Sequence, residues 1–395
     1  MFPKRRGNGM KFGVNYTPRV DWFHHWLDFD VSDVARDFDT IAELGADHVR
    51  VFPLWPLFQP NPTFISPTTL GRLDEMLTLA ARSGLQVAVD GLQGHLSSFD
   101  FLPAWLLSWH RRNMFTDAEA VAATARYLEA ISRVAADHEN AFAVTVGNEV
   151  NQFSGGIHPD PHPATPAEIS LWLGEMLAAI RRGAPQLLAL HSCYDASWYD
   201  DRQPFTLEHV ARDGDATIVH SWVFNGTGQL YGPDAFETQA HARYLMEVAR
   251  AFQLDPARPI WMQEVGAPRN ILPEASIPAF IEETVAQVAA APDVYGITWW
   301  CSHDVARSLA QYPELEYDLG LIDENGVIKR EGEIVRDAIA AARDVAPDQP
   351  SKEIVLDLDA IGGRPGLAPG GVFFEAYMAE VRATGHPRVR LRVTS

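Results

Sequence analysis

The sequence predicts a (β/α)₈ barrel, the TIM barrel of the α/β class, with a small C-terminal appendage. Eight short apolar runs alternate with longer segments that carry helical start and stop signals. The runs are continuously hydrophobic, which is typical of strands buried on both faces of a parallel sheet. Eight strand–helix units in series favour a closed barrel over an open doubly wound sheet, and no glycine-rich phosphate-binding motif occurs.

The expected strands are rich in β-branched and aromatic residues, as pleated, buried segments are. In chain order they span Phe12–Asn15, His48–Phe52, Gln86–Val89, Ala141–Val146, Leu187–His191, Thr217–His220, Pro259–Gln263 and Val294–Trp300.

Two of the expected helices end before a glycine, which favours the left-handed conformation of a C-terminal cap. They span Asp33–Leu44, before Gly45, and Leu70–Ser83, before Gly84. Start signals mark two more helices. Thr116 with Glu119, and Thr165-Pro166 with Glu168, have the spacing of a capping box. Further helices are expected at Asp234–Phe252, Pro278–Ala290 and Glu331–Ala342.

The chain divides into three parts by composition. Residues 1–9 are expected to be a basic tail, residues 10–345 the barrel, and residues 346–395 a linker and small appendage. The appendage contains one strand-like run, Ile354–Leu358, and a basic end that we interpret as a solvated strand edge.

Charge and composition exclude several function classes. With 52 acidic and 32 basic residues, the net charge of −20 repels nucleic acid and anionic membrane surfaces. Two cysteines, Cys193 and Cys301, are too few for a disulfide framework and have no zinc-site spacing. No secretory signal and no apolar run of membrane-spanning length is recognised, so a cytoplasmic protein is expected. Whether the chain forms a homo-oligomer stays open.

Two glutamates stand out by their positions in the predicted barrel. Glu149 follows the fourth strand and Glu264 ends the seventh, so both are expected at the C-terminal mouth, on opposite sides of the opening. A carboxylate at the end of an apolar strand is costly to desolvate and persists there for a partner or a task. Retaining glycoside cleavage needs two such groups roughly 5–5.5 Å apart. The alternative is that either glutamate belongs to a structural ion pair.

Arg50 lies inside the second apolar run, where a cation that cannot lose its charge needs a partner. We interpret it as the group that keeps Glu264 ionised; a purely structural ion pair in the barrel is the alternative.

Long connections follow the third and fourth strands, at Gly91–Phe115 and Gly147–Ala164. As a group, the aromatic residues of the first connection and of residues 21–26 are expected to stack on sugar, and the long loops to close one end of the cleft; for any single aromatic, packing in the core is the alternative. Those of the first connection are Phe99, Phe101, Trp105 and Trp109.

These residues together resemble glycoside hydrolase family 5, over residues 10–343. The resemblance is carried by the Gly-Asn-Glu end of strand four, the glutamate ending strand seven, Arg50, His220 at the end of strand six and the Trp299-Trp300 pair on strand eight. It implies that Glu149 is the general acid/base and Glu264 the nucleophile of a retaining enzyme.

The same resemblance implies roles for the surrounding residues. Asn148 would bind the sugar 2-hydroxyl, Arg50 would orient the nucleophile, and His220 would hold the acid/base. One of Trp299 and Trp300 would form the floor of the −1 subsite. The other residues expected to contact substrate are Trp222, Tyr194, Gln93, His95, Asn15 and Tyr16.

The sequence departs from the family at two positions. The family usually has a tyrosine two residues after the strand-six histidine, where this chain has Trp222. We therefore expect another group, Tyr194, to supply the second donor to the nucleophile. The third strand of the family commonly ends in His-Gly, whereas here Gln93 precedes Gly94 and His95 follows.

Longer stretches resemble the bacterial branch of exo-acting β-mannosidases in this family, which is associated with the Man-β-1,4-GlcNAc unit of N-glycans. These stretches include GVNYTP, GNEVNQFS, HSWVFNG and TWWCSHD. The predicted function is hydrolysis of terminal β-1,4-linked mannose in a short oligosaccharide, by double displacement. The alternatives are a β-glucosidase, an endo-acting glucanase or mannanase, and a non-catalytic sugar-binding barrel. No cofactor and no metal is expected, although His24, His25, His158 and His162 are available as ligands.

Overall fold

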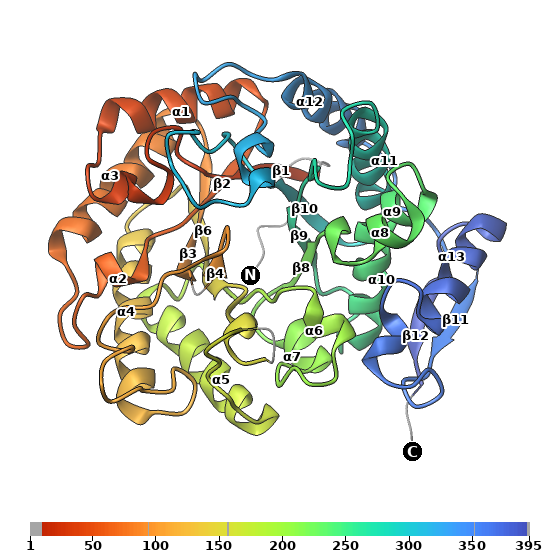
Figure 1. Cartoon of the computed structure of the whole chain (residues 1–395), viewed down its shortest axis with the longest axis horizontal. Coiled ribbons are helices and arrows are strands. Elements are labelled where there is room, and N and C mark those ends of the chain that lie inside the picture. The colour runs from red at the N-terminus through yellow and green to blue at the C-terminus, as the bar shows by residue number, and fades with distance from the viewer. Residues whose placement is uncertain (1–9, 94, 156–157, 351, 393–395) are drawn as a thin grey trace.

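The computed structural model describes residues 10–93, 95–155, 158–350 and 352–392, and within them the chain forms a barrel of eight parallel strands (Figure 1). The predicted TIM barrel is confirmed. The strands are β1 (Lys11–Asn15), β2 (His48–Val51), β3 (Gln86–Gln93), β6 (Ala141–Asn148), β7 (Leu188–Leu190), β8 (Thr217–Ser221), β9 (Ile260–Val265) and β10 (Val294–Trp299).

The strands are hydrogen-bonded in the order β7-β6-β3-β2-β1-β10-β9-β8, so β7 and β8 are the two ends of the sheet and the barrel is nearly closed. All seven pairings are parallel. Parallel strands put all their C-terminal ends at one rim, where loops that leave these ends meet. A two-stranded hairpin of β4 (His95–Leu96) and β5 (Phe99–Asp100) lies in the loop after β3.

Helices surround the barrel because each buries one apolar face against the strands. The main ones are α1 (Val31–Glu43), α3 (Pro67–Arg82), α4 (Ala118–Ala136), α5 (Pro166–Gly183), α10 (His241–Phe252), α11 (Ile277–Ala289) and α12 (Arg330–Ala342). Short helices occupy the connections: α2 (Trp55–Phe58), α6 (Ala196–Tyr199), α7 (Leu207–Arg212), α8 (Thr227–Tyr231) and α9 (Phe236–Gln239). None of the helices described is long and apolar enough to cross a membrane.

Most of the predicted helix ends are confirmed. Gly45 and Gly84 have φ of 76° and 74°, as left-handed caps require, and Thr165 forms a complete capping box on α5. The cap predicted at Thr116 is wrong: the side chain of Asp117 accepts the first backbone N–H groups of α4. The helix predicted over residues 234–252 is interrupted at Ala240, which separates α9 from α10.

The C-terminal segment forms a small strand–helix–strand unit outside the barrel (Figure 1). Strands β11 (Glu353–Leu356) and β12 (Arg388–Leu391) pair in parallel, and α13 (Val372–Thr384) lies between them in the chain. β12 packs against α10, and the Arg364 guanidinium donates to backbone carbonyls of residues 197, 200 and 205 in the barrel. Arg390 and Arg392 make exposed ion pairs with acidic residues of the same unit. The tail predicted at residues 1–9 lies outside the described residues.

The barrel interior is filled in layers. Buried side chains of a separate apolar cluster, including Phe142, Ile218 and Trp261, fill one layer. The Trp261 indole donates to Thr298 Oγ1 at 2.8 Å. Further toward the C-terminal ends, buried polar side chains such as Arg50 and Gln263 replace them. The apolar layer closes the base of the barrel, so chemistry is confined to the opposite mouth.

Candidate active site

The two glutamates predicted from the sequence meet at the mouth of the barrel. A carboxylate oxygen of Glu149, one of Glu264 and a ring nitrogen of His220 all lie within 4.8 Å of one another. His220 Nδ1 is 2.7 Å from Glu149 Oε1 and 3.3 Å from Glu264 Oε2. Both carboxylates are nearly buried, with 6% and 4% of their residue surface exposed. Residues more than a hundred positions apart therefore share one sugar-sized site.

A shift in strand register helps to align His220 with Glu264. Val219 of β8 pairs with Met262 of β9, but the next residue, His220, pairs with Glu264 and skips one position of β9. An irregularity of this kind turns the following side chains, which is a common device near active sites. Without it the histidine would pair with Gln263.

Glu149 has an unusual backbone conformation, with φ 47° and ψ 37°. This left-handed conformation is uncommon for a residue other than glycine and is found where the surrounding structure enforces it, often at functional sites. Two residues earlier, Gly147 is required because a Cβ there would lie 2.5 Å from the Leu92 carbonyl oxygen. After Glu149 the chain enters a 3₁₀ turn, from which Gln152 Nε2 donates to Glu149 Oε2 at 2.7 Å.

Arg50 is fully buried and connects the strands behind the site. Its guanidinium donates to Glu264 Oε2 at 3.2 Å, to Asn148 Oδ1 at 2.7 Å and to Asn15 Oδ1 at 3.0 Å. It also donates twice to Asp90 Oδ2, at 2.9 and 2.6 Å. Both interpretations of Arg50 therefore describe part of its environment: it is in a buried ion pair with Asp90 and it holds Glu264. Burial raises the pKa of Asp90 to about 6, although Arg50 acts to lower it.

Glu264 receives hydrogen bonds on both of its oxygens. Trp222 Nε1 donates to Oε1 at 3.1 Å, while Arg50 donates to Oε2. This differs from the prediction that Tyr194 supplies the second donor. The Trp222 indole reaches the carboxylate because it follows directly after β8 and is stacked on Phe224, with ring centroids 4.8 Å apart.

The electrostatics of the glutamates and His220 are strongly linked. Burial raises the pKa of Glu264, whereas His220, Arg50 and the Trp222 hydrogen bond act to lower it. Burial opposes a charge on His220, but Glu264 and Glu149 outweigh this and raise the pKa of the imidazole. Its other nitrogen, Nε2, lies 3.3 Å from the Gln263 side-chain oxygen, so both ring nitrogens face acceptors. This environment favours the protonated form of His220.

A cavity of about 270 Å³ opens above the two glutamates. It contains seven of the predicted site residues: His95, Asn148, Glu149, Tyr194, Trp222, Glu264 and Trp300. Its remaining walls are formed by Leu96, Ser97, Ser98, Gln152, Phe224, Pro313, Leu315 and Glu316. Of the tryptophan pair, Trp300 lines the cavity, and Trp299 is a buried residue of β10 that does not.

Three other predicted contact residues are buried and do not line the cavity. Gln93 donates to backbone carbonyls of its own strand. Asn15 donates to backbone carbonyls of β9 and β10 and accepts from Arg50. The Tyr16 hydroxyl donates to Asp37 Oδ2 at 3.0 Å. These residues differ from the prediction because their polar groups already have protein partners.

The aromatic residues expected to stack on sugar do not line this cavity. Phe99 and Phe101 pack against Phe23, with ring centroids 5.8 and 4.6 Å apart. Trp105 donates to a backbone carbonyl, and Trp109 is fully exposed. The apolar side chains of these loops that are buried pack against one another and do not face the active-site cavity.

Two parts of the wall were not named as site residues from the sequence, although the first lies in the connection Gly91–Phe115 that was expected to close one end of the cleft. Ser97 and Ser98 form the turn of the β4–β5 hairpin, and residues 313–316 belong to the long connection between β10 and α12. For residues 313–316 the length of the connection was the available signal. Residues 300–329 form a long connection at the C-terminal end of the eighth strand, where barrel enzymes build their sites. Its most buried acidic residue is Glu316, at 7% exposure.

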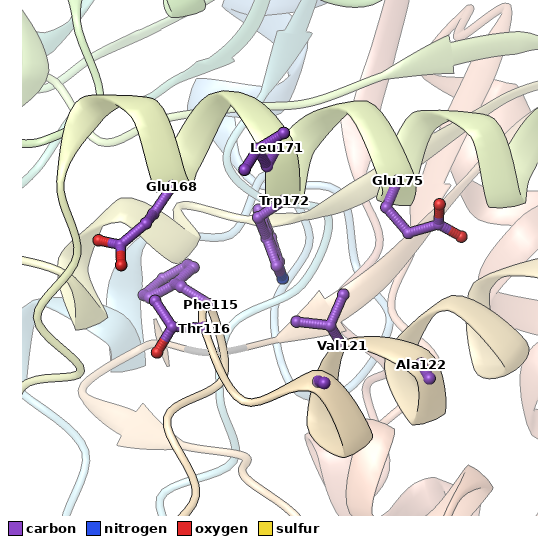
Figure 2. A pocket seen from close by; sticks show the side chains of 9 residues that line it. Phe115, Thr116, Val121, Ala122, Glu168, Leu171, Trp172 and Glu175 are labelled. Carbon is purple, nitrogen blue, oxygen red and sulfur yellow. The ribbon is translucent and has the colours of Figure 1, made fainter.

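A second hollow, a groove of about 440 Å³, lies between α4 and α5 on the outside of the barrel; Figure 2 shows the residues that line it. Trp172 projects from α5 toward Val121 of α4, and Leu171 of α5 also lines the groove. The acidic groups on its edge have other partners, since Glu168 caps α5 and Glu175 accepts from Arg182. The groove therefore offers an apolar surface without free catalytic groups among its described residues.

The described residues contain one cluster of three or more metal-ligating side chains, and it is Glu149, His220 and Glu264. Their oxygens already accept hydrogen bonds from Gln152, Trp222 and Arg50. Arg50 places a positive charge beside Glu264 of this pair.

Comparisons with solved structures agree with the fold. No model of a protein family matches the chain, and no curated protein does. Among solved structures, a GH5_18 protein from Streptomyces cattleya is 50% identical with a TM-score of 0.94; the match covers 97% of this chain and 94% of the other. A GH5_18 protein from Bifidobacterium longum subsp. infantis is 43% identical with a TM-score of 0.94, covering 98% and 92%.

A more distant structure shares only the fold. It is the exo-β-1,4-mannosidase Op5Man5 from an Opitutaceae bacterium, 23% identical with a TM-score of 0.80, and the match covers 97% of this chain and 69% of the other. The two closer similarities extend over nearly the whole of both chains, and they confirm the resemblance seen in the sequence. The chain is a glycoside hydrolase and belongs to subfamily 18 of glycoside hydrolase family 5, GH5_18.

Proposed function

We propose that this glycoside hydrolase is a retaining exo-β-mannosidase that releases the terminal mannose of Man-β-1,4-GlcNAc. The observation that carries the mechanism is the pair of buried carboxylates within 4.8 Å, a spacing suited to retention rather than inversion. The substrate is supported by the S. cattleya protein, a Glu-to-Ala variant of which is in complex with Manβ1-4GlcNAc.

In the first step Glu264 attacks the anomeric carbon of the mannosyl unit. A bond forms between that carbon and a Glu264 oxygen, while the bond to O4 of GlcNAc breaks and this oxygen takes the proton of Glu149. Donation from Arg50 and Trp222 favours the ionised form of Glu264, which the attack requires.

In the second step Glu149 takes a proton from water, and the water oxygen displaces Glu264 from the anomeric carbon. Two displacements on opposite faces return the mannose with its original β configuration. His220 lies against both carboxylates, at 2.7 and 3.3 Å, and its positive charge offsets their repulsion while the proton moves. We assign it as a positioning residue for Glu149.

Two further residues are proposed to bind the mannosyl unit. In the described structure Asn148 uses one of its two N–H donors, to the His95 carbonyl oxygen at 2.9 Å, which leaves the other for the sugar 2-hydroxyl. Trp300 lines the cavity on the side of Glu264 and Trp222 and offers an aromatic face to the pyranose ring. Arg50 is a positioning residue because it lies behind Glu264.

Exo action is supported by the size of the cavity. Its volume of about 270 Å³ is slightly below the usual range of small-ligand sites, and residues of the β4–β5 hairpin and of the β10–α12 connection form its walls. A site of this size suits one or two sugar units better than a polymer.

The test is incubation with Man-β-1,4-GlcNAc, followed by proton NMR of the released sugars. We expect mannose and GlcNAc in equal amounts, with β-mannose as the first anomer. Mannobiose, an aryl β-glucoside and a mannan polymer are compared in parallel. Faster cleavage of the glucoside or of internal mannan bonds would assign a glucosidase or an endo-acting enzyme, first-formed α-mannose would contradict retention, and binding without product would indicate a non-catalytic barrel.

Replacing Trp222 with Phe is expected to lower kcat roughly 10- to 100-fold, the usual effect of losing a hydrogen bond to a charged group. The variant keeps an aromatic ring but loses the N–H that donates to Glu264 at 3.1 Å. Steady-state kinetics on an aryl mannoside measure the loss, and Trp222→Tyr is expected to recover part of it. Trp109→Phe, on a fully exposed side chain, is the matched control. An unchanged kcat in Trp222→Phe would show that this hydrogen bond is dispensable.

A further inference from the structure

Three buried polar atoms in the cavity wall have no hydrogen-bond partner among the described residues. They are Glu316 Oε2, Ser97 Oγ and Trp300 Nε1. Each comes from a different segment: Glu316 from a 3₁₀ turn (Glu314–Asp318), Ser97 from the β4–β5 turn, and Trp300 from the end of β10. Burying a polar group without a partner is costly, so three at one wall point to a group that satisfies them together.

The three residues line the same cavity, and Ser97 and Trp300 both act on the Glu316 carboxyl. Burial raises the pKa of Glu316 to about 7, and the polar groups of Ser97 and Trp300 act against it. Both donor groups therefore lie near the Glu316 carboxyl, yet Glu316 Oε2, Ser97 Oγ and Trp300 Nε1 each lack a partner at full hydrogen-bond distance among the described residues.

The chemistry of the cluster selects a hydroxyl group. A hydroxyl has one hydrogen to donate and two lone pairs that accept. Glu316 can take its hydrogen, and the Trp300 N–H and the Ser97 hydroxyl can donate to its oxygen. One inserted hydroxyl would satisfy all three groups.

The cluster lies on the Glu264 side of the cavity. The Trp300 ring contacts the Trp222 ring edge-on, with centroids 6.5 Å apart, and Trp222 donates to Glu264. The charge of Glu264 also acts to raise the pKa of Glu316. The sugar that contacts these groups is therefore the one that would become bonded to Glu264, not the leaving sugar.

We propose that Glu316, Ser97 and Trp300 bind one hydroxyl of the terminal mannosyl unit, with Glu316 as its acceptor, and that this contact restricts the enzyme to chain ends. The inference rests on the proposed function. A hydroxyl enclosed by three buried groups cannot carry a further sugar, because the glycosidic oxygen would have no hydrogen to give Glu316.

The test compares Glu316→Gln with Glu314→Gln in the full-length enzyme. Glu314 belongs to the same turn, but its side chain is 80% exposed and pairs with Arg307. On aryl β-mannoside we expect kcat/KM to fall about 10- to 100-fold in Glu316→Gln and to stay within about twofold of wild type in Glu314→Gln.

Monodeoxy aryl mannosides separate recognition from a structural effect. In the wild type, removal of the hydroxyl that Glu316 binds is expected to lower kcat/KM strongly, and in Glu316→Gln that same removal is expected to have little further effect. If every deoxygenation lowers kcat/KM by the same factor in both enzymes, or if Glu316→Gln stays within twofold of wild type, the inference is overturned.

A binding experiment distinguishes this outcome from failure of the proposed function. Calorimetry measures the affinity of Man-β-1,4-GlcNAc for Glu149→Ala with and without Glu316→Gln, and weaker binding in the double variant is expected. If the wild type releases no mannose yet this difference is found, the proposed function fails and the hydroxyl contact stands. If neither variant binds the disaccharide, both are overturned.

Discussion

Glu264→Gln is expected to lower kcat by at least about 10⁴-fold while the fold is retained, as the loss of a covalent nucleophile does in other hydrolases. The amide cannot form the glycosyl-enzyme, because its oxygen is a weak nucleophile and its nitrogen carries no free pair for attack. Replacing the carboxylate by an amide hardly changes the shape of the side chain. Since the amide oxygen that replaces a carboxylate oxygen can still accept from Arg50 or Trp222, whose donors lie 3.2 and 3.1 Å from the native Glu264 carboxylate, unfolding of the barrel is not expected.

Steady-state kinetics with an aryl β-mannoside measure the loss of kcat, and circular dichroism with thermal unfolding checks that the fold is retained. Glu283→Gln is the matched control because Glu283 is an exposed residue of α11, outside the cavity. Mass spectrometry with a slow fluoro-sugar substrate gives an independent readout: the wild type should gain a covalently bound sugar on the peptide that contains Glu264, and the variant should not. A labelled peptide elsewhere, or turnover near the wild-type rate, would contradict the assignment.

The sequence was sufficient for the residues whose positions follow from strand order. In a parallel barrel all strands end at one rim, so a glutamate after the fourth strand and another at the end of the seventh had to meet there. Arg50 was recognisable because a permanent charge inside an apolar strand must find an acidic partner, and the structure gives it both Asp90 and Glu264.

The remaining features depend on distances that a linear pattern does not contain. The register shift at His220 and the reach of the Trp222 indole are set by a bulge and a following turn. Tyr16 belongs to a motif at the mouth but is directed to Asp37. Glu316 lies in an irregular connection, where no periodicity marks which side chain turns inward.

Glu149→Ala is expected to separate substrates by their leaving groups. The alanine cannot protonate O4 of GlcNAc, so kcat/KM for Man-β-1,4-GlcNAc should fall by about 10²–10⁴-fold, the usual contribution of a general acid. The dinitrophenolate of a dinitrophenyl β-mannoside leaves without being protonated, so the rate of the first step on this substrate should remain within about tenfold of wild type. Its second step loses the general base, and a rapid burst of dinitrophenol followed by slow turnover is expected.

Azide tests the second step directly, because it attacks the glycosyl-enzyme without needing a base. The smaller side chain leaves room for azide in the space of the Glu149 carboxylate, which Gln152 and His220 hold in the native enzyme. Turnover should rise with azide concentration, and the product should be β-mannosyl azide by NMR. Glu139→Ala, on an exposed residue before β6, should show neither effect. Equal losses on both substrates without azide rescue would remove Glu149 from the acid/base role, and an α-mannosyl azide would instead indicate attack from the face that Glu264 occupies.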